Sequence, residues 1–210
     1  MSPYLQTILA FAGIWAVTII SPGPDFVVTV KHATAGSRLH GVMAALGVAT
    51  GCAVWAVGSL LGLSVLLSEA RWLYDLVRVA GALYLAYLGV KTILGAKRPL
   101  VVGSAGTARL DGLDGLSALR AGLLTNLGNP KAMAFFGSLF ATLFPVHAPM
   151  WVHAATLLVV FCMAAGWFSG VAWAFSLAPV ASAYRKAKKW IDYVTGGIFI
   201  LLGARLAVLR

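Results

Sequence analysis

The sequence predicts an all-helical integral membrane protein with six transmembrane helices, arranged as two inverted repeats of three. Of its 210 residues, 60% are hydrophobic and only 10% are charged, whereas about 25% of the residues in a soluble domain are charged. So few polar side chains cannot cover a soluble surface, which means that lipid must cover it. A span takes about 20 residues, so six spans with their loops fill this length. An ordinary cytosolic enzyme, a disordered protein and a disulfide scaffold are excluded.

Six apolar stretches follow one another along the chain, and each is long enough to cross a bilayer. No Lys or Arg precedes the first, and no small-residue cleavage site follows it, so we expect a span of the mature protein rather than a signal peptide. The long polar connection before the fourth stretch is rich in Gly and charge and reads as a flexible linker. The stretches cover residues 4–30, 39–67, 72–94, 116–145, 150–180 and 190–209.

The linker divides the six spans into two halves of three. The third and sixth spans share a Leu-Gly pair followed two residues later by a basic residue, at 88–91 and 202–205. Because each half holds an odd number of spans, the halves would lie upside down relative to each other. We expect one transmembrane domain over residues 1–210, with a first repeat at about 1–95, a cytoplasmic linker at 96–115 and a second repeat at about 116–210.

Basic residues give the expected orientation. The chain holds 16 Lys and Arg against 6 Asp and Glu, and in membrane proteins such an excess collects in cytoplasmic loops rather than indicating nucleic acid. The loops after spans one, three and five, with their edges, hold Lys31, Arg38, Lys91, Lys97, Arg98, Arg109, Arg120, Arg185, Lys186, Lys188 and Lys189. The opposite side holds only Arg71, Arg78, Arg205 and Arg210. These loops are therefore expected in the cytoplasm and both termini outside.

Prolines should break the first and fourth spans. Residues 21–25 read Ser-Pro-Gly-Pro-Asp, and residues 128–131 read Gly-Asn-Pro-Lys. A proline inside a helix removes a hydrogen bond and clashes with the preceding turn. Ser21 and Asn129 are each followed by proline, which suits an N-cap at the start of a new half-helix. Each of these spans should therefore consist of a half-helix, a break and a capped half-helix.

The two breaks point to a transport site. Irregular backbone at membrane depth is tolerated where it is buried in protein or lines a watery cavity, and matched breaks in two repeats are typical of a transporter site. Asp25 and Lys131 add an intramembrane charge to each break, and such charges pair or line a site. Two plainer interpretations remain open: the prolines only kink the helices, or Asp25 and Lys131 only neutralise each other.

Other residues give no sign of catalysis or metal binding. The four His residues lie at or near loops, and Cys52 and Cys162 are expected as small apolar fillers. No nucleotide-binding, serine-hydrolase or zinc-protease motif is present. We therefore expect no enzyme activity, no metal and no cofactor. Lys188 and Asp192, four residues apart near a span end, read as a solvated helical pair, as does the pair Asp75 and Arg78.

Glycines at helical spacing predict close contacts between helices. Small residues four apart let helix backbones approach in a membrane. The pairs are Gly47 with Gly51, Gly58 with Gly62, and Gly166 with Gly170.

Both Pro motifs resemble those of a known family, the lysine-exporter (LysE/RhtB) amino acid efflux proteins. The matching runs are Ser-Pro-Gly-Pro-Asp-Phe at 21–26 and Gly-Leu-Leu-Thr-Asn-Leu-Gly-Asn-Pro-Lys-Ala at 122–132. Outside the linker the similarity covers nearly the whole chain and is closest to the members that export threonine. It implies a multi-pass exporter in the bacterial inner membrane, driven by the proton gradient. Members export threonine, homoserine, other neutral amino acids or lysine.

The function expected from these observations is secondary-active, proton-coupled export of a small amino acid, with threonine or homoserine first. The alternatives are export of lysine, another neutral amino acid or a cation, and a membrane scaffold without transport. Expected partners are the amino acid, protons and the lipid bilayer, and a homo-oligomer is compatible with the sequence. Asp25 should bind the substrate ammonium and carry the proton. The expected substrate-binding residues are Ser21, Pro22, Gly23, Pro24, Asp25, Asn126, Asn129, Pro130 and Lys131.

Overall fold

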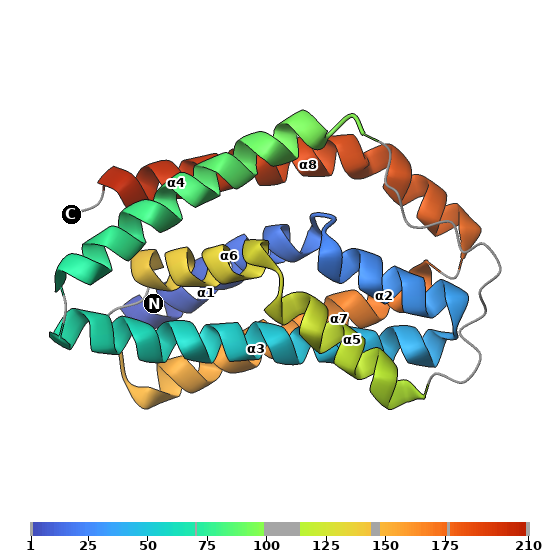
Figure 1. Ribbon diagram of the computed structural model, residues 1–210, viewed down its shortest axis with the longest axis horizontal. Coiled ribbons are helices and arrows are strands. Elements are labelled where there is room, and N and C mark those ends of the chain that lie inside the picture. The colour runs from blue at the N-terminus through green and yellow to red at the C-terminus, as the bar shows by residue number, and fades with distance from the viewer. Residues whose placement is uncertain (1, 70, 99–113, 144–147, 176, 209–210) are drawn as a thin grey trace.

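The computed structural model describes the chain except for residues 1, 70, 99–113, 144–147, 176 and 209–210. The described residues form eight α-helices and no strand, so the all-helical class is confirmed (Figure 1). Most of the predicted linker lies outside the described residues. The helices are α1 (Pro3–Ile20), α2 (Pro24–Ala35), α3 (Arg38–Glu69), α4 (Arg71–Gly95), α5 (Gly115–Leu127), α6 (Pro130–Leu143), α7 (Met150–Ala174) and α8 (Ala178–Val208).

Three of the described helices are long and apolar enough to cross a bilayer by themselves. They are α1, the Arg38–Gly62 part of α3, and α7. The Val79–Gly95 part of α4 is a shorter apolar helix. Within the predicted stretches 4–30 and 116–145 the chain forms two helices each, α1 with α2 and α5 with α6.

The boundary between the last two predicted spans differs from the boundary between α7 and α8. The sequence placed it between residues 180 and 190, but α7 ends at Ala174 and α8 already begins at Ala178. Pro179 lies in the first turn of α8, where the missing N–H of proline would have no helical partner in any case. The basic segment after Pro179 therefore belongs to a long helix instead of a loop.

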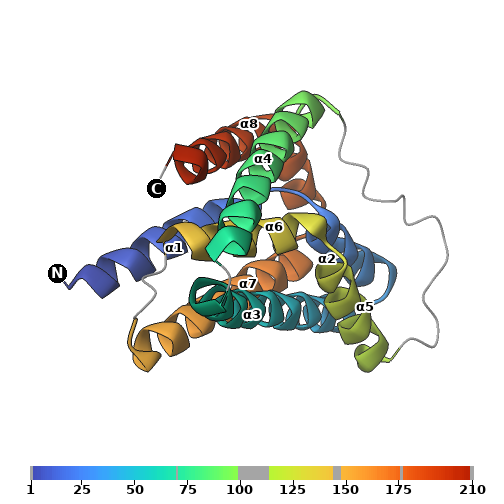
Figure 2. The ribbon, with the colours of Figure 1, turned by 60° about the vertical axis from the view of Figure 1, so that its left-hand side comes forward.

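The helices lie in layers, and two pairs from the two halves, α4 with α8 and α3 with α7, run side by side in opposite directions (Figures 1 and 2). Helix α4 packs along α8, α3 packs along α5 and α7, and α1 with α6 lies between these two groups. The ends of the chain marked N and C lie at the same end of the molecule (Figure 1). The α2–α3 and α7–α8 junctions lie at the other end.

Glycines bring two pairs of helices into backbone contact. A Cβ atom on Gly122 of α5 would lie 2.0 Å from the carbonyl oxygen of Ala44 on α3, and one on Gly47 would lie 2.0 Å from that of Leu119. Between α4 and α8, a Cβ on Gly89 would lie 2.5 Å from the Gly196 carbonyl oxygen. The close contact predicted at Gly47 and Gly51 is confirmed, because Gly51 meets the Asn126 side chain in the same way.

The other predicted glycine pairs were wrong. A Cβ on Gly58, Gly62, Gly166 or Gly170 would find nothing within 4 Å. Periodicity alone does not reveal which face of an apolar helix meets a neighbour, because both faces are equally hydrophobic in a membrane protein.

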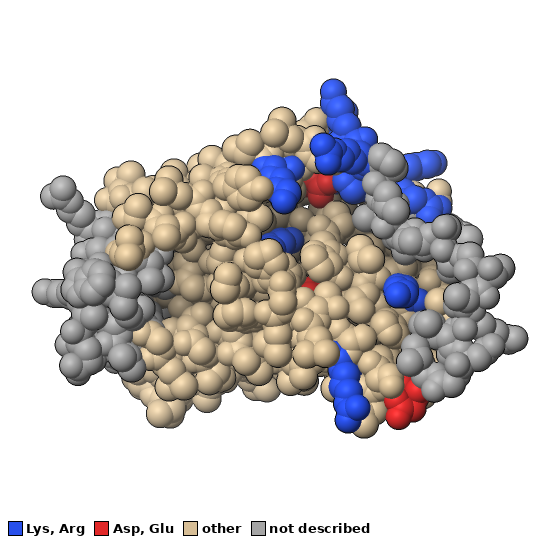
Figure 3. Space-filling view, in the orientation of Figure 1, with Lys and Arg blue, Asp and Glu red and all other residues tan. Residues whose placement is uncertain are grey.

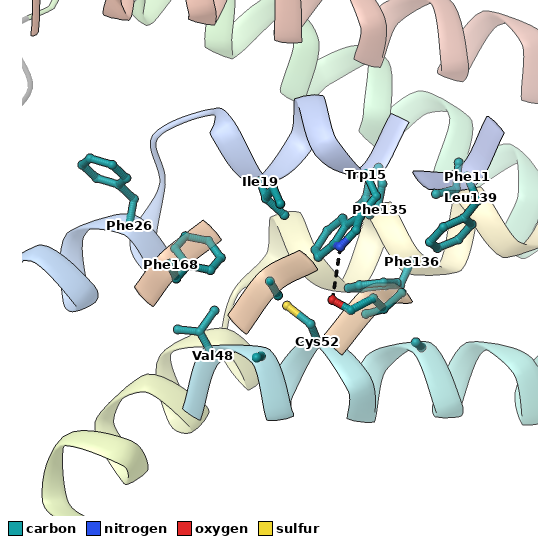
Figure 4. Close-up of a cluster of buried hydrophobic side chains, with 14 of the residues drawn as sticks. Phe11, Trp15, Ile19, Phe26, Val48, Cys52, Phe135, Phe136, Leu139 and Phe168 are labelled. Carbon is teal, nitrogen blue, oxygen red and sulfur yellow. Dashed lines mark hydrogen bonds between the residues drawn. The ribbon is translucent and has the colours of Figure 1, made fainter. Parts of the chain in front are cut away.

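An aromatic core fills the centre of the molecule (Figure 4). Trp15 of α1 stacks on Phe135 of α6, with 5.3 Å between ring centroids, and contacts Phe136 at 5.0 Å. The Trp15 indole Nε1–H also donates a hydrogen bond of 3.3 Å to the Val160 carbonyl oxygen on α7. This core therefore joins the first broken span to the second and to α7.

Basic side chains gather at one end of the molecule, where α2 meets α3 and α7 meets α8 (Figure 3). Because Lys and Arg collect on the cytoplasmic side, we expect reporter fusions after Lys31, within residues 97–109 and after Lys186 to report the cytoplasm. Fusions at both termini should report the outside. A cytoplasmic C-terminus would contradict this prediction and show that one stretch does not cross.

Candidate functional site

The chain breaks first between α1 and α2. Helix α1 ends at Ile20, Ser21 and Gly23 are both extended (φ −66°, ψ 128° and φ −164°, ψ −170°), and α2 begins at Pro24. Ser21 and Gly23 each precede a proline, which disfavours helical backbone at both. The predicted N-cap at Ser21 was therefore wrong: the new helix cannot begin until after the second proline, and Gly23 takes the cap position.

The second break lies between α5 and α6. Helix α5 ends at Leu127, and the Gly128 N–H donates back to the Leu124 carbonyl oxygen at 2.9 Å. The Asn129 side-chain oxygen accepts a hydrogen bond of 3.0 Å from the Lys131 backbone N–H, and α6 begins at Pro130. The predicted cap at Asn129 is confirmed.

Asp25, in the first turn of α2, joins the two breaks. Its Oδ2 atom accepts hydrogen bonds of 3.0 Å from the side-chain amides of Asn126 and Asn129, on either side of the second break. Asn126 also contacts the Cys52 sulfur at 3.3 Å, so Cys52 positions this amide as well as filling space. The Oδ1 atom of Asp25 is buried and has no hydrogen-bond partner among the described residues. One carboxylate oxygen thus holds the two breaks together while the other remains without a donor.

Lys131, in the first turn of α6, does not pair with Asp25. Its Nζ atom donates to the Thr18 carbonyl oxygen at 3.3 Å and lies 5.5 Å from the centroid of the Phe199 ring. No ion pair between Lys131 and Asp25 occurs among the described residues. The two charges thus do not form a direct ion pair, although they lie in one cavity and act on each other. An ammonium has three donors, and only one is used here by a hydrogen bond to the described chain.

The two charged groups share a cavity. Its free space is about 30 Å³, room for about two water molecules. Five predicted site residues line it: Ser21, Gly23, Asp25, Asn129 and Lys131. The rest of its wall consists of Trp15, Thr18, Ile19, Phe26, Ala132, Phe135 and Phe168.

The remaining predicted residues play other parts. Asn126 lies behind Asp25 and orients it, while Pro22, Pro24 and Pro130 shape the backbone. Sequence reasoning missed the aromatic wall, because nothing in a uniformly apolar stretch marks which side faces inward. The two charged groups offer an acceptor for a cation at Asp25 and a donor for an anion at Lys131.

Comparison with known proteins covers the same stretch that forms this site. The model of the LysE type translocator family matches residues 4–210. The chain belongs to this family. It is 34% identical over 206 residues to the "Threonine efflux protein" of Escherichia coli (strain K12), covering 98% of this chain and all of that protein.

Further relatives of this LysE-type chain are also membrane transport or membrane proteins by name. The "Threonine efflux protein" of Salmonella typhimurium is 33% identical, covering 92% of this chain and 94% of the relative. The "Uncharacterized membrane protein YahN" of Escherichia coli (strain K12) is 26% identical, covering 96% and 89%. No solved structure matches the chain. With its apolar helices, the LysE-type chain is a multi-pass protein of the bacterial inner membrane.

Aromatic side chains pack beside the first break of the LysE-type chain. The Phe26 ring stacks on the Tyr184 ring, with 4.7 Å between centroids and 12° between planes, and both meet Phe175 edge-on. The Tyr184 hydroxyl donates a hydrogen bond of 2.9 Å to the Ile20 carbonyl oxygen at the end of α1. Helix α8 is thereby fixed against the first break.

One ion pair of the LysE-type chain was misassigned from the sequence. Lys188 and Asp192 were expected in solvent, but they are only 9% and 4% exposed. Their Nζ and Oδ2 atoms lie 2.6 Å apart, and Lys188 also lies 3.4 Å from the Gly95 carbonyl oxygen. The reason is the early start of α8, which places the pair well inside a helix packed on α4.

Proposed function

We propose that the chain exports a small neutral amino acid, threonine or homoserine first, in exchange for protons. One observation carries this proposal: a carboxylate with an unpaired oxygen and an under-bonded ammonium line one cavity at two helix breaks. An amino acid zwitterion carries the complementary pair of charges. Leaving either end unpaired away from water costs several kcal/mol, so both ends need the partners that Asp25 and Lys131 offer.

The substrate ammonium fits the free Oδ1 atom of Asp25, and the substrate carboxylate fits the Lys131 Nζ atom. The N-terminal end of α6, with its positive dipole, favours the carboxylate at the same place. The substrate side chain would then face the apolar part of the wall. This wall holds one positive and one negative group, so the second ammonium of lysine would find no acceptor, and a neutral side chain is favoured. The relatives named "Threonine efflux protein" support threonine.

Coupling to protons follows from the same carboxylate. A proton and a substrate ammonium are alternatives at Asp25, because each neutralises the same oxygen. We further propose that the six stretches form two inverted repeats, supported by the opposite directions of α3 and α7 and of α4 and α8. The cavity is smaller than an amino acid, so loading requires the helices around the breaks to move apart.

Transport itself is tested in everted membrane vesicles. Under an imposed proton gradient, vesicles with this protein should accumulate labelled threonine, and vesicles without it should not. A scaffold without transport predicts equal uptake in both. Growth tests with a panel of toxic amino acids then distinguish threonine from homoserine, lysine and other neutral substrates, and metal resistance on overexpression would indicate cation export instead.

Replacing Lys131 with Met should chiefly weaken substrate binding. A hydrogen bond to a charged group is worth about 1.5–3 kcal/mol, which corresponds to about 10–100-fold in the threonine concentration for half-maximal transport. Met keeps the length of the side chain and the contact with Phe199 while it removes the ammonium. Initial rates of uptake at increasing threonine concentration measure this effect. A loss of maximal rate at unchanged half-maximal concentration would contradict the assigned role.

A further inference from the structure

Helix α8 carries a buried polar stripe that leads to the proposed transport site. Tyr184, Lys188, Asp192 and Thr195 follow one another at helical spacing, so they share one face of α8. Lys188, Asp192 and Thr195 are at most 9% exposed, and the Thr195 hydroxyl has no hydrogen-bond partner among the described residues. The next turn of this face carries Phe199, which is fully buried with its ring under the Lys131 ammonium.

Lys131 thus shares a cavity with Asp25 and lies over the Phe199 ring, on the face of α8 that also carries Asp192. The charge of Asp25 and, less strongly, that of Asp192 act on its ammonium. Neither carboxylate forms an ion pair with Lys131 in the part of the chain that the structure describes, and Asp192 is instead paired with Lys188. Asp192 is thus a second buried acid near the site, where sequence reasoning found only Asp25.

Counting charges over a transport cycle shows when Asp192 matters. With Asp25 ionised, two carboxylates (Asp25, Asp192) balance two ammonium groups (Lys131, Lys188). A bound zwitterion adds no net charge, so the loaded state is also balanced. After release outside, Asp25 takes a proton for the return, and one positive charge is left over. An uncompensated charge inside a membrane protein is costly, so the substrate-free return state depends most on the remaining carboxylate.

We propose that Asp192 is a positioning residue for this return step, holding the Lys131 ammonium in place when Asp25 is protonated and the cavity is empty of substrate. The inference rests on the proposed antiport of a zwitterionic amino acid against protons. The simpler role for Asp192 is a staple, in which its pair with Lys188 only fastens α8 to the end of α4.

Two transport modes separate these roles in reconstituted vesicles. Gradient-driven export of labelled threonine passes through the protonated, substrate-free return state. Exchange of labelled for unlabelled threonine at equal concentrations, without a gradient, uses only loaded states. We expect Asp192→Asn to lower gradient-driven export about tenfold, which equals about 1.4 kcal/mol, and to leave exchange within about twofold of wild type. The retained exchange also shows that the variant is folded.

Lys188→Met is the matched control from the same ion pair. It keeps the Asp192 carboxylate and leaves Lys131 as its remaining nearby cation, so gradient-driven export should fall no further than exchange does. A staple loses its function when either partner is removed, so it predicts equal losses in both variants and in both modes. The proposal would be overturned if Asp192→Asn lost gradient-driven export and exchange to the same extent. It would also be overturned if Lys188→Met showed the same pattern of losses as Asp192→Asn. If Asp192→Asn does not fold, the double variant Lys188→Met/Asp192→Asn, which removes both charges of the buried pair, takes its place. A selective loss of gradient-driven export then supports the proposal, and an equal loss of both modes overturns it.

Failure of the proposed function gives a different result. If the wild-type protein neither exports nor exchanges threonine, antiport of this substrate is wrong, whatever the variants show. If the wild-type protein does both and the variants lose both modes together, only the role of Asp192 is wrong.

Discussion

Asp25→Asn should abolish gradient-driven export of threonine while the protein still folds. An Asn side chain has nearly the shape of Asp, and its oxygen can still accept the hydrogen bonds that Asn126 and Asn129 donate to Oδ2. It places an NH₂ group where the free Oδ1 atom lies. The substrate ammonium then meets a donor instead of a carboxylate, and no group remains there to carry the proton.

The expected effect is large. Removing one partner of a buried charge pair costs about 3–5 kcal/mol, which corresponds to more than about 100-fold. Uptake of labelled threonine into everted vesicles, at matched amounts of folded protein, measures it. If Asp25→Asn exported threonine at the wild-type rate with unchanged pH dependence, the proposed mechanism would be wrong and the role of Asp25 would be structural only.

Asp114→Asn is the matched control for the same chemical change. Asp114 is the exposed N-cap of α5, and its side chain accepts a hydrogen bond of 2.8 Å from the Ser117 backbone N–H. This bond, with a further one from the Ser117 side chain, holds the pKa of Asp114 below its ordinary value, so the side chain is charged at neutral pH. Asn is an equally good N-cap. Transport by Asp114→Asn should therefore equal that of the wild type.

Gly122→Ala should strongly destabilise the protein, although it adds a single methyl group. The new Cβ would lie 2.0 Å from the Ala44 carbonyl oxygen, with other backbone atoms of Ala44 directly behind it. Backbone cannot move aside as a flexible side chain can, so α3 and α5 must part. Inserting one group into a tight site costs about 1–3 kcal/mol or more, and stability is only about 5–15 kcal/mol in total.

Gly58→Ala is the control, because a Cβ there meets nothing within 4 Å. In detergent, we expect Gly58→Ala to elute as a single species with the thermal midpoint of wild type, and Gly122→Ala to aggregate or melt well below it. Parting α3 from α5 also withdraws Asn126 from Asp25, so any folded Gly122→Ala protein should transport poorly. An unchanged midpoint for Gly122→Ala would show that the two helices are not in backbone contact.

The sequence revealed the parts of the site that depend on local backbone chemistry. Proline and Asn residues act on their own turn, so the interruptions near Pro24 and Pro130 and the cap at Asn129 could be predicted. The same reasoning failed at Ser21, where two prolines compete and the second one decides where the helix begins.

What could not be predicted depends on contacts between distant segments. A stretch that is apolar all round does not show which side faces the cavity, so Trp15 and Phe168 were missed. The burial of Asp192 follows from the packing of α8 on α4, and its effect on Lys131 follows from a crossing between α8 and α6. Helical spacing places Asp192 on a polar face of α8 but does not show which helices that face meets.

The small, aromatic-lined cavity has a consequence for the energy supply of the cell. Protons cross a membrane along files of hydrogen-bonded water, and this cavity admits about two molecules. The rings of Trp15, Phe26 and Phe135 line the cavity (Figure 4), and Phe26 packs in turn on Tyr184 and Phe175. In this conformation the packed rings leave room for only a short file of water, so we expect a resting protein to leak few protons and to spare the gradient that powers its neighbours in the same membrane.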